Sequence, residues 1–406
     1  MEKFRDNISV YLNYLMVAYA FILPLSRAGI IAISALMVII SLFDRELKSN
    51  LSKIWKTPLT RIIIIFVLFN VVSLFWVSEE NIVSAMDYLV KYWYFLPSFI
   101  IYLYLRENNM YVVISSFILG MFVSEIIAYG IFFEIWSWRN VTPDNPSPFM
   151  HHIEYSTFLA FTALLLLNRI FNEGSIKSKI FYLFFFSTIL GNLFLTNGRT
   201  GQIAFILGLI LLGFLSFKNK IKALLITSLI SITVLSMAYT FSNTFHERVI
   251  IGKSDISEVV QNQNYCSSWG ARLGFWIISV DITKQNPIVG VGIKDNMSEF
   301  HSLVKTTYPQ MKCIDYLPHF HNQYLQIVTS TGLVGLSIFL VLLLRIFMLD
   351  IKSKRYNNIK IIFLSVLTFG FFAEPLLHAQ FSMLFFSLIV GTLLAQTRIE
   401  KCKKEI

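Results

Sequence analysis

The residues best suited to chemistry lie in the stretch PHFHNQYLQ, which begins at Pro318. It contains His319 and His321, followed by Asn322, directly before a long apolar run. A neutral imidazole titrates near pH 6.5 and can accept a proton from an attacking hydroxyl group. Asn322 could position that nucleophile or fix the tautomer of the histidine. The structural alternative is that these residues only cap a helix.

A metal site is not predicted here. Two histidines that are two residues apart diverge if they lie in a helix, and no nearby cysteine or carboxylate completes a zinc-ligand spacing.

Three arginines occur in unusual settings: Arg139 in WSWRN, Arg199 in TNGRTG and Arg272 in WGARLGFW. A planar guanidinium group can bind two phosphate oxygens at once, which a lysine cannot do. For Arg199, the flanking Gly198 and Gly201 would let backbone N–H groups approach the same anion, and the helix predicted to begin there would point its positive end at it. The alternatives are a snorkelling residue at the membrane interface for Arg199 and a loop salt bridge for Arg272.

Further polar residues are weaker candidates. Glu154 and Tyr155 in HHIEYS, and Glu374 and His378 in AEPLLHAQ, could line an acceptor groove, although structural or gating roles are preferred. Glu125 lies within an apolar run and is expected to face protein rather than lipid.

The composition identifies the kind of molecule that positions these residues. The 406 residues are 55% hydrophobic and only 14% charged, with a mean hydropathy of +0.64. The apolar residues form blocks long enough to cross a hydrocarbon layer of about 30 Å. The sequence therefore predicts an all-α polytopic membrane protein whose first helix is retained. The net charge of +10 reflects cytoplasmic loops rather than binding to nucleic acid.

Twelve membrane spans are predicted from these blocks, and the motifs fall at their ends. The spans are 8–25, 28–43, 62–77, 92–105, 111–135, 153–168, 180–196, 201–217, 223–241, 324–349, 359–373 and 380–397. Lysines and arginines concentrate in alternate short loops, so the positive-inside rule predicts that both termini are cytoplasmic. The histidines and the three arginines then share the external side.

The long segment 242–322 would also lie outside, as a subdomain between helices 1–9 (residues 1–241) and helices 10–12 with the tail (residues 323–406). Its Cys266 and Cys313 would face an oxidising compartment, where either a disulfide or two free thiols is compatible with the sequence, whereas Cys402 would remain reduced. Gly332 and Gly335, in TGLVGL, are expected to let a second helix pack closely.

The spacing of these residues is similar to that in the bacterial O-antigen ligase family. His321 and Asn322 are followed, after nine residues, by Gly332-Leu333-Val334-Gly335, and Arg199 and the Gly-Ala-Arg ending at Arg272 precede them. The resemblance covers the whole chain in layout and about residues 190–340 in motifs. It implies a type C glycosyltransferase-like fold with one large periplasmic loop in the bacterial inner membrane.

The resemblance also implies the chemistry. Arg199 and Arg272 would bind the pyrophosphate of an undecaprenyl-pyrophosphate-linked glycan donor, and His321 would act as base or positioner for the acceptor hydroxyl. Supporting or acceptor-site roles would fall to His319, Asn322, Arg139, Glu154 and Tyr155. No metal or other cofactor is implied, and the remaining partners are the lipid A core acceptor and membrane lipids.

Ligation of O-antigen to the lipid A core is the preferred function. An O-antigen polymerase and an O-linked protein oligosaccharyltransferase share the same motifs and remain alternatives. A lipid-linked oligosaccharide flippase belongs to a different class; it would place charges along a path through the bilayer and would show internal repeats, whereas here no repeat is found and the unusual residues gather at one face.

Overall fold

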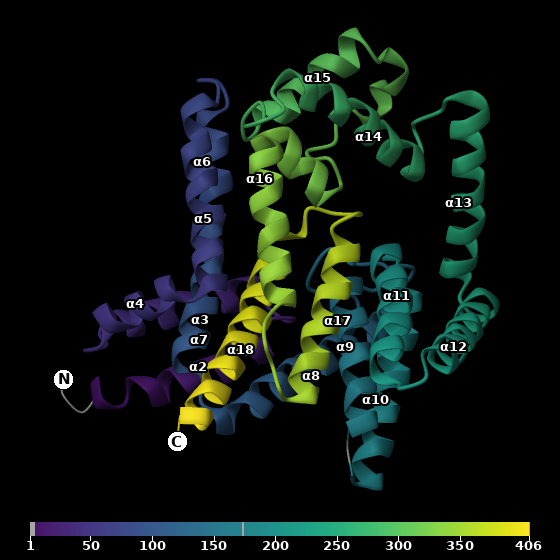
Figure 1. Cartoon of the computed structure of the whole chain (residues 1–406). Helices are drawn as coiled ribbons and strands as arrows, with labels where there is room; N and C mark the ends of the chain where they lie inside the picture. The colour runs from purple at the N-terminus through teal and green to yellow at the C-terminus, as the bar shows by residue number, and fades with distance from the viewer. Residues whose placement is uncertain (1–4, 173, 406) are drawn as a thin grey trace.

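The computed structural model describes residues 5–172 and 174–405, and within them the chain is helical and has no β-sheet (Figure 1). An isolated bridge joins Trp138 and Val141. The predicted all-α fold is confirmed.

A helix lies in each of the twelve predicted runs. In chain order these helices are α2 (Ile8–Ile22), α3 (Arg27–Leu42), α5 (Pro58–Val72), α7 (Leu96–Tyr104), α8 (Glu107–Phe132), α9 (His152–Asn172), α10 (Ile176–Leu195), α11 (Arg199–Ser216), α12 (Lys220–Phe241), α16 (Gln323–Phe347), α17 (Lys354–Gly370) and α18 (Gln380–Glu405). Among the described residues, seven helical segments are long and apolar enough to cross a membrane, or eight if α3 and α4 (Leu47–Lys56), which are bent by 113°, form one broken span. The protein is thus a multi-pass membrane protein, and the number twelve stays a prediction.

The centre of the bundle is formed by α9 and α18. In each of these helices, 83% of the residues in the apolar stretch of 18 residues are buried. Helix α9 packs against α10, α11 and α17, and α18 packs against α7. Phe158 and Phe161 of α9 contact the ring of Phe385 of α18, with centroids 4.7 and 4.8 Å apart. This packing brings the beginnings of α9 and α11 together with the end of α17, where the candidate site residues lie.

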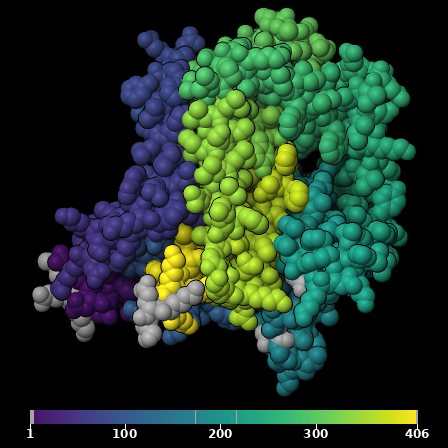
Figure 2. Space-filling view, in the orientation of Figure 1, coloured from purple at the N-terminus to yellow at the C-terminus, as the bar shows by residue number. Residues whose placement is uncertain are grey.

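The segment 242–322 forms α13 (Asn243–Asn262), α14 (Ser268–Gln285), α15 (Asp295–Thr306) and the 3₁₀ turn η3 (Pro309–Ile314). Side chains of α14, α15 and η3 build a second hydrophobic cluster that includes Phe275, Phe300 and Phe320. A disulfide joins Cys266 to Cys313, so the first of the two alternatives is confirmed. Figures 1 and 2 show α14 and α15 covering the upper end of the bundle, above the start of α16. We call this segment the loop subdomain.

Short elements connect the remaining helices. They are η1 (Ser73–Trp76), α6 (Ile82–Val90), η2 (Lys91–Phe95) and η4 (Leu376–His378). The turn between η1 and α6 holds the loop subdomain, because the carboxylate of Asp295 accepts a hydrogen bond of 2.7 Å from Ser78 N and one of 2.6 Å from Asn81 Nδ2.

Helix α16 is interrupted at Gly332, which has φ of 65°. The backbone of residues 286–292 fills this break: Val291 N donates to Thr329 O at 3.0 Å, and Leu333 N donates to Pro287 O at 2.8 Å. A Cβ at Gly332 would lie 2.3 Å from Ile288 O, so a side chain cannot be accommodated there. The expectation of a closely packed second helix is wrong for Gly332, because its close partner is a turn. It holds beside Gly335, where a Cβ would lie 3.3 Å from the ring of Phe69 in α5 (Pro58–Val72).

Candidate active site

His319 and His321 both face the carboxylate of Glu374, in the turn after α17. His321 Nδ1 lies 2.8 Å from one carboxylate oxygen, and His319 Nε2 lies 3.2 Å from the other. The two rings do not diverge as they would in a helix, because α16 begins only at Gln323 and the preceding segment is irregular. Phe320, between them, is buried in the hydrophobic cluster of the loop subdomain. We call His319, His321 and Glu374 the histidine cluster.

The local sequence explains how this segment is held. Asn322 is the N-cap of α16, and its side-chain oxygen accepts hydrogen bonds from the backbone N–H groups of Tyr324 and Leu325. Such a cap typically stabilises a helix by about 1 kcal/mol. Gln323 N donates to Phe371 O at 2.8 Å, which ties the start of α16 to the end of α17. Asn322 therefore places His321 through the backbone.

The protonation states follow from these contacts. Burial by itself would raise the pKa of Glu374, but the hydrogen bond from His321 and the nearby imidazoles hold that pKa below its ordinary value. Burial lowers the pKa of His319 to about 4. At neutral pH Glu374 is ionised and accepts hydrogen bonds only, so the ring nitrogens that face it both carry hydrogens. In neutral His321 the free acceptor is then Nε2.

The histidine cluster also has the composition of a metal site. One ligand atom from each of the three residues can be chosen so that all lie within 4.8 Å of one another. The sequence argument against a metal considered only residues near the histidines and missed Glu374, which lies 53 positions from His321. In this arrangement each carboxylate oxygen faces one imidazole nitrogen, a contact that suits proton transfer.

The arginines predicted to bind an anion lie nearby, on α11 and α14. Arg199, predicted just before the span 201–217, is the first residue of α11. Its Nη1 and Nη2 atoms are enclosed and have no hydrogen-bond partner among the residues that the structure describes. Its charged neighbours are Arg248, Arg272 and Asp255. An enclosed guanidinium group without partners is unfavourable. The arrangement favours binding of an anion at Arg199.

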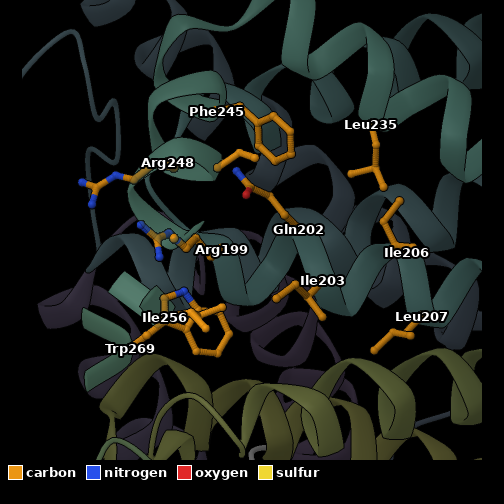
Figure 3. A pocket seen from close by; sticks show the side chains of 12 residues that line it. Arg199, Gln202, Ile203, Ile206, Leu207, Leu235, Phe245, Arg248, Ile256 and Trp269 are labelled. Atoms are coloured by element: carbon orange, nitrogen blue, oxygen red, sulfur yellow. The ribbon is translucent and has the colours of Figure 1, made fainter. Parts of the chain in front are cut away.

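A pocket of about 370 Å³ opens beside Arg199. Figure 3 shows Arg199 and Arg248 at one end, with Trp269 below them, and aliphatic side chains extending to the other end. These aliphatic residues are Ile203, Ile206, Leu207 and Leu235. The pocket is therefore suited to a ligand with an anionic head and a long apolar tail. We call it the arginine pocket.

The glycines beside Arg199 have a different role from the one predicted. Gly201 N donates to Gly198 O and to Ser156 Oγ, so this N–H is already used. A Cβ at Gly198 would lie 2.2 Å from Ser156 Cβ. These glycines let the start of α11 pack against α9, and the side chains rather than these backbone groups face the anion site.

Arg272 connects the two groups. Its Nη1 donates to Ser268 O at 2.9 Å and to Ser268 Oγ at 2.8 Å. Burial lowers its pKa, while the carboxylates of Glu374 and Asp255 act in the opposite direction. Arg272 is thus electrostatically coupled both to the histidine cluster and to Arg199, which the sequence placed more than seventy residues away.

Two predicted acceptor-groove residues lie in the interior. Tyr155 is fully buried, and its hydroxyl oxygen accepts a hydrogen bond of 2.9 Å from Asn192 Nδ2. Glu154 is buried, and one of its oxygens accepts hydrogen bonds from the backbone N and the hydroxyl group of Ser382. Both side chains hold α9 to its neighbours and do not join the histidine cluster.

The other candidates are dispersed. Arg139 lines a separate pocket with Arg27. His378 stacks on Tyr88 with ring centroids 3.7 Å apart, and burial holds its pKa well below the ordinary value. Glu125 is 1% exposed and accepts a hydrogen bond from Thr188, which confirms that it faces protein.

Arg248 was missed by sequence reasoning. It lies on α13 and donates from Nε to Asn197 Oδ1 at 2.9 Å. A signal was present: Phe245, Val249, Gly252 and Ile256 recur at helical spacing around Arg248, and all of them line the arginine pocket.

Comparisons with known proteins agree with the sequence motifs. Residues 184–340, which include Arg199, Arg272 and His321, match the family model described as O-Antigen ligase, so the resemblance to that family is confirmed over this domain. The match supports a place in the O-antigen ligase/polymerase superfamily, whose members are glycosyltransferase-like enzymes. An uncharacterized protein of Haemophilus influenzae is 26% identical over 223 residues, 53% of this chain and 55% of that protein. The chain thus spans about half the length of this curated relative.

Proposed function

We propose that this protein, which carries an O-antigen ligase domain over residues 184–340, transfers O-antigen polysaccharide from undecaprenyl pyrophosphate to the lipid A core. The observation that carries the proposal is the unpartnered guanidinium group of Arg199 at the polar end of an otherwise aliphatic pocket, coupled through Arg272 to the histidine cluster. A lipid-linked pyrophosphate has matching chemistry: an anionic head group attached to an isoprenoid tail.

In the proposed complex Arg199 and Arg272 bind the pyrophosphate, and Arg248 adds a third positive charge at the same end of the pocket. The isoprenoid units next to the head group lie along Ile203, Ile206 and Leu207. When the glycan leaves, negative charge accumulates on the pyrophosphate, and fixed guanidinium groups in a water-poor pocket stabilise it.

The reaction involves one bond exchange at the anomeric carbon of the donor sugar. The acceptor hydroxyl oxygen attacks this carbon, and the bond between the carbon and the pyrophosphate oxygen breaks. His321 Nε2 accepts the hydroxyl proton, and the electron pair of the broken bond stays on the departing pyrophosphate. Glu374 orients the ring of His321 through Nδ1 and stabilises the imidazolium that forms.

The site is assigned to the periplasmic face of the inner membrane, with both termini in the cytoplasm. The distribution of lysines and arginines supports this orientation. The disulfide between Cys266 and Cys313 supports it independently, because such bonds persist in oxidising compartments.

The test is complementation of a host that makes lipid-linked O-antigen but lacks a ligase. On a lipopolysaccharide gel, we expect the native chain to give a ladder of glycan on lipid A core. A His321→Ala variant that is inserted in the membrane should give no ladder. If the native chain gives no ladder in this host but restores chain elongation in a polymerase-deficient host, the protein is a polymerase and the ligase proposal fails.

A further inference from the structure

A second pocket, of about 580 Å³, lies between the start of α3 and the loop that connects α8 to α9. Its lining includes Arg27, Arg139, Trp138 and Phe149, and it shares no residue with the arginine pocket. None of its residues has a part in the reaction described above. We call it the α3 pocket.

The charge of the α3 pocket is positive. Arg27 and Arg139 are both exposed, and among the described residues neither forms a salt bridge within 4.0 Å. Glu154 is an acidic neighbour of Arg27, but its carboxylate is buried and accepts hydrogen bonds from Ser382. The guanidinium group of Arg27 also lies over the ring of Phe381, with Cζ 5.5 Å from the centroid, a contact that uses its face and not its N–H groups. Both guanidinium groups can therefore donate to an anionic ligand from the open side.

The aromatic residues of the α3 pocket are held in place. The indole N–H of Trp138 donates to Pro148 O at 2.9 Å, and its ring meets Phe149 edge-on with centroids 5.3 Å apart. Ser26 and Ser147 add hydroxyl groups to the lining. Fixed aromatic faces beside hydroxyl and charged groups suit a pyranose ring, which has an apolar face and a polar rim.

The α3 pocket is connected to the histidine cluster through the residue that follows its lining in the chain. Met150 lines the pocket, and the next residue, His151, interacts electrostatically with Glu374, His321 and Arg27. The loop is also joined to the Arg199 connection, because Asn197 N donates to Asn145 Oδ1 at 3.0 Å. Arg272 links the cluster to the arginine pocket, and His151 links it to the α3 pocket.

We propose that the α3 pocket binds a phosphorylated saccharide, with Arg27 and Arg139 on the phosphate group and Trp138 against the sugar ring. Within the proposed ligase function, this saccharide is the acceptor, and binding here presents its hydroxyl group to His321. The acceptor role rests on the proposed function, whereas the binding chemistry does not.

Direct binding tests this assignment. Full-length protein in nanodiscs of neutral lipid is titrated with core oligosaccharide released from lipopolysaccharide, either with its phosphate groups or after their removal by hydrogen fluoride. We expect Arg27→Gln and Arg139→Gln each to weaken binding of the phosphorylated probe about tenfold, and removal of the phosphates to weaken wild-type binding similarly. Lys305→Gln, an exposed change on α15 outside both pockets, is the control.

These arginines could bind a phosphate group on a saccharide or one in a lipid headgroup. A second binding experiment distinguishes the two ligands. Nanodiscs of phosphatidylglycerol that leave binding of the saccharide unchanged support the proposal; loss of binding in them shows that a lipid headgroup is the preferred ligand and overturns it. Unchanged affinity in Arg27→Gln and Arg139→Gln also overturns it.

The outcome is separable from that of the proposed function. In the transfer assay the same variants are expected to raise the acceptor KM about tenfold while kcat and the donor KM remain close to those of the wild type. A wild-type protein that binds the phosphorylated probe through these arginines but transfers nothing upholds the pocket and refutes the ligase. If both variants transfer glycan with the acceptor KM of the wild type, the ligase proposal stands and the proposed role of the α3 pocket is refuted.

Discussion

The histidine cluster and the arginine pocket are neighbouring groups of charged residues that differ in how far their contacts are complete. Both oxygens of Glu374 are engaged by imidazole nitrogens, so the cluster is satisfied without a ligand. In the arginine pocket, Nη1 and Nη2 of Arg199 have no partner, and two more arginines lie close by. The proton-transfer half of the site is therefore preorganised, whereas the anion-binding half is completed by its ligand. The following predictions are arranged from the largest expected effect to the smallest.

In the histidine cluster, the substitution with the largest expected effect on activity is His321→Ala. Removing a general base typically lowers the rate by 10²- to 10⁴-fold, so we expect kcat to fall about 10³-fold with donor binding retained. The measurement is transfer of glycan from a lipid-linked donor by purified protein.

The chain supplies a matched control for this variant. His301 Nδ1 lies 2.8 Å from Asp315 Oδ1 in the loop subdomain, the same separation as between His321 and Glu374. His301→Ala removes an equivalent pair outside the cluster and should leave kcat within about twofold. Full activity in His321→Ala would contradict the proposed mechanism.

In the arginine pocket, substitution of Arg199 should affect activity and stability in different ways. Arg199→Gln is expected to reduce transfer about 10²-fold, because a fixed donor to the leaving group is lost. Since the unpartnered guanidinium group is unfavourable in the empty pocket, the same change should preserve or raise the apparent Tm without donor. Arg199→Lys should restore little activity, since an ammonium group cannot bind two oxygens in a planar fork.

A lowered Tm in Arg199→Gln would show that the guanidinium group is stabilised in the empty protein. The contrast between the two halves of the site would then be wrong.

Glu374→Gln tests whether the carboxylate positions His321. An amide has one accepting oxygen and one donating nitrogen, so it cannot accept hydrogen bonds from both imidazoles. We expect kcat to fall about tenfold. Asp315→Asn is the control, and an unchanged kcat in Glu374→Gln would limit Glu374 to a structural role.

The last prediction has the smallest effect on activity, because it concerns the pH dependence of stability. The pKa of His319 falls from 6.5 to about 4 on folding, so the unfolded chain binds more protons between these values and stability is lost as the pH falls from 6.5 towards 4. The pKa shift corresponds to roughly 3 kcal/mol, or a few degrees in apparent Tm. His319→Gln should flatten this part of the pH dependence, and His151 and His378, whose pKa values are also lowered, contribute to the slope that remains. An identical slope in wild type and variant would contradict the prediction.

Sequence patterns predicted the features that depend on local periodicity and composition. Each apolar run contains a helix, and α11 begins two residues before the predicted span 201–217. These helices follow from residues close in sequence, whereas the sequence left the pairing of Cys266 with Cys313 open and the structure decides it.

The features that were missed depend on contacts between distant segments. Glu374 reaches His321 across 53 positions, and no spacing rule joins a turn after one helix to the start of another. Gly332 was expected to face a helix because glycines in a membrane helix let another helix pack closely, yet its positive φ and its loop partner become visible only in three dimensions. Tyr155 shares a polar stretch with His151 but points into the bundle, since helical geometry sends adjacent residues to different faces.

The interruption of α16 has a mechanical consequence. The turn segment 286–292 is hydrogen-bonded into the break at Gly332, and Asp295, three residues further along, is hydrogen-bonded to the turn after η1. The loop subdomain is thus attached to the bundle at two separate points, the break in α16 and the turn after η1. Two attachments at separate points restrict rotation of the loop subdomain, so we expect α14 to keep Arg272 at a constant position relative to the start of α16.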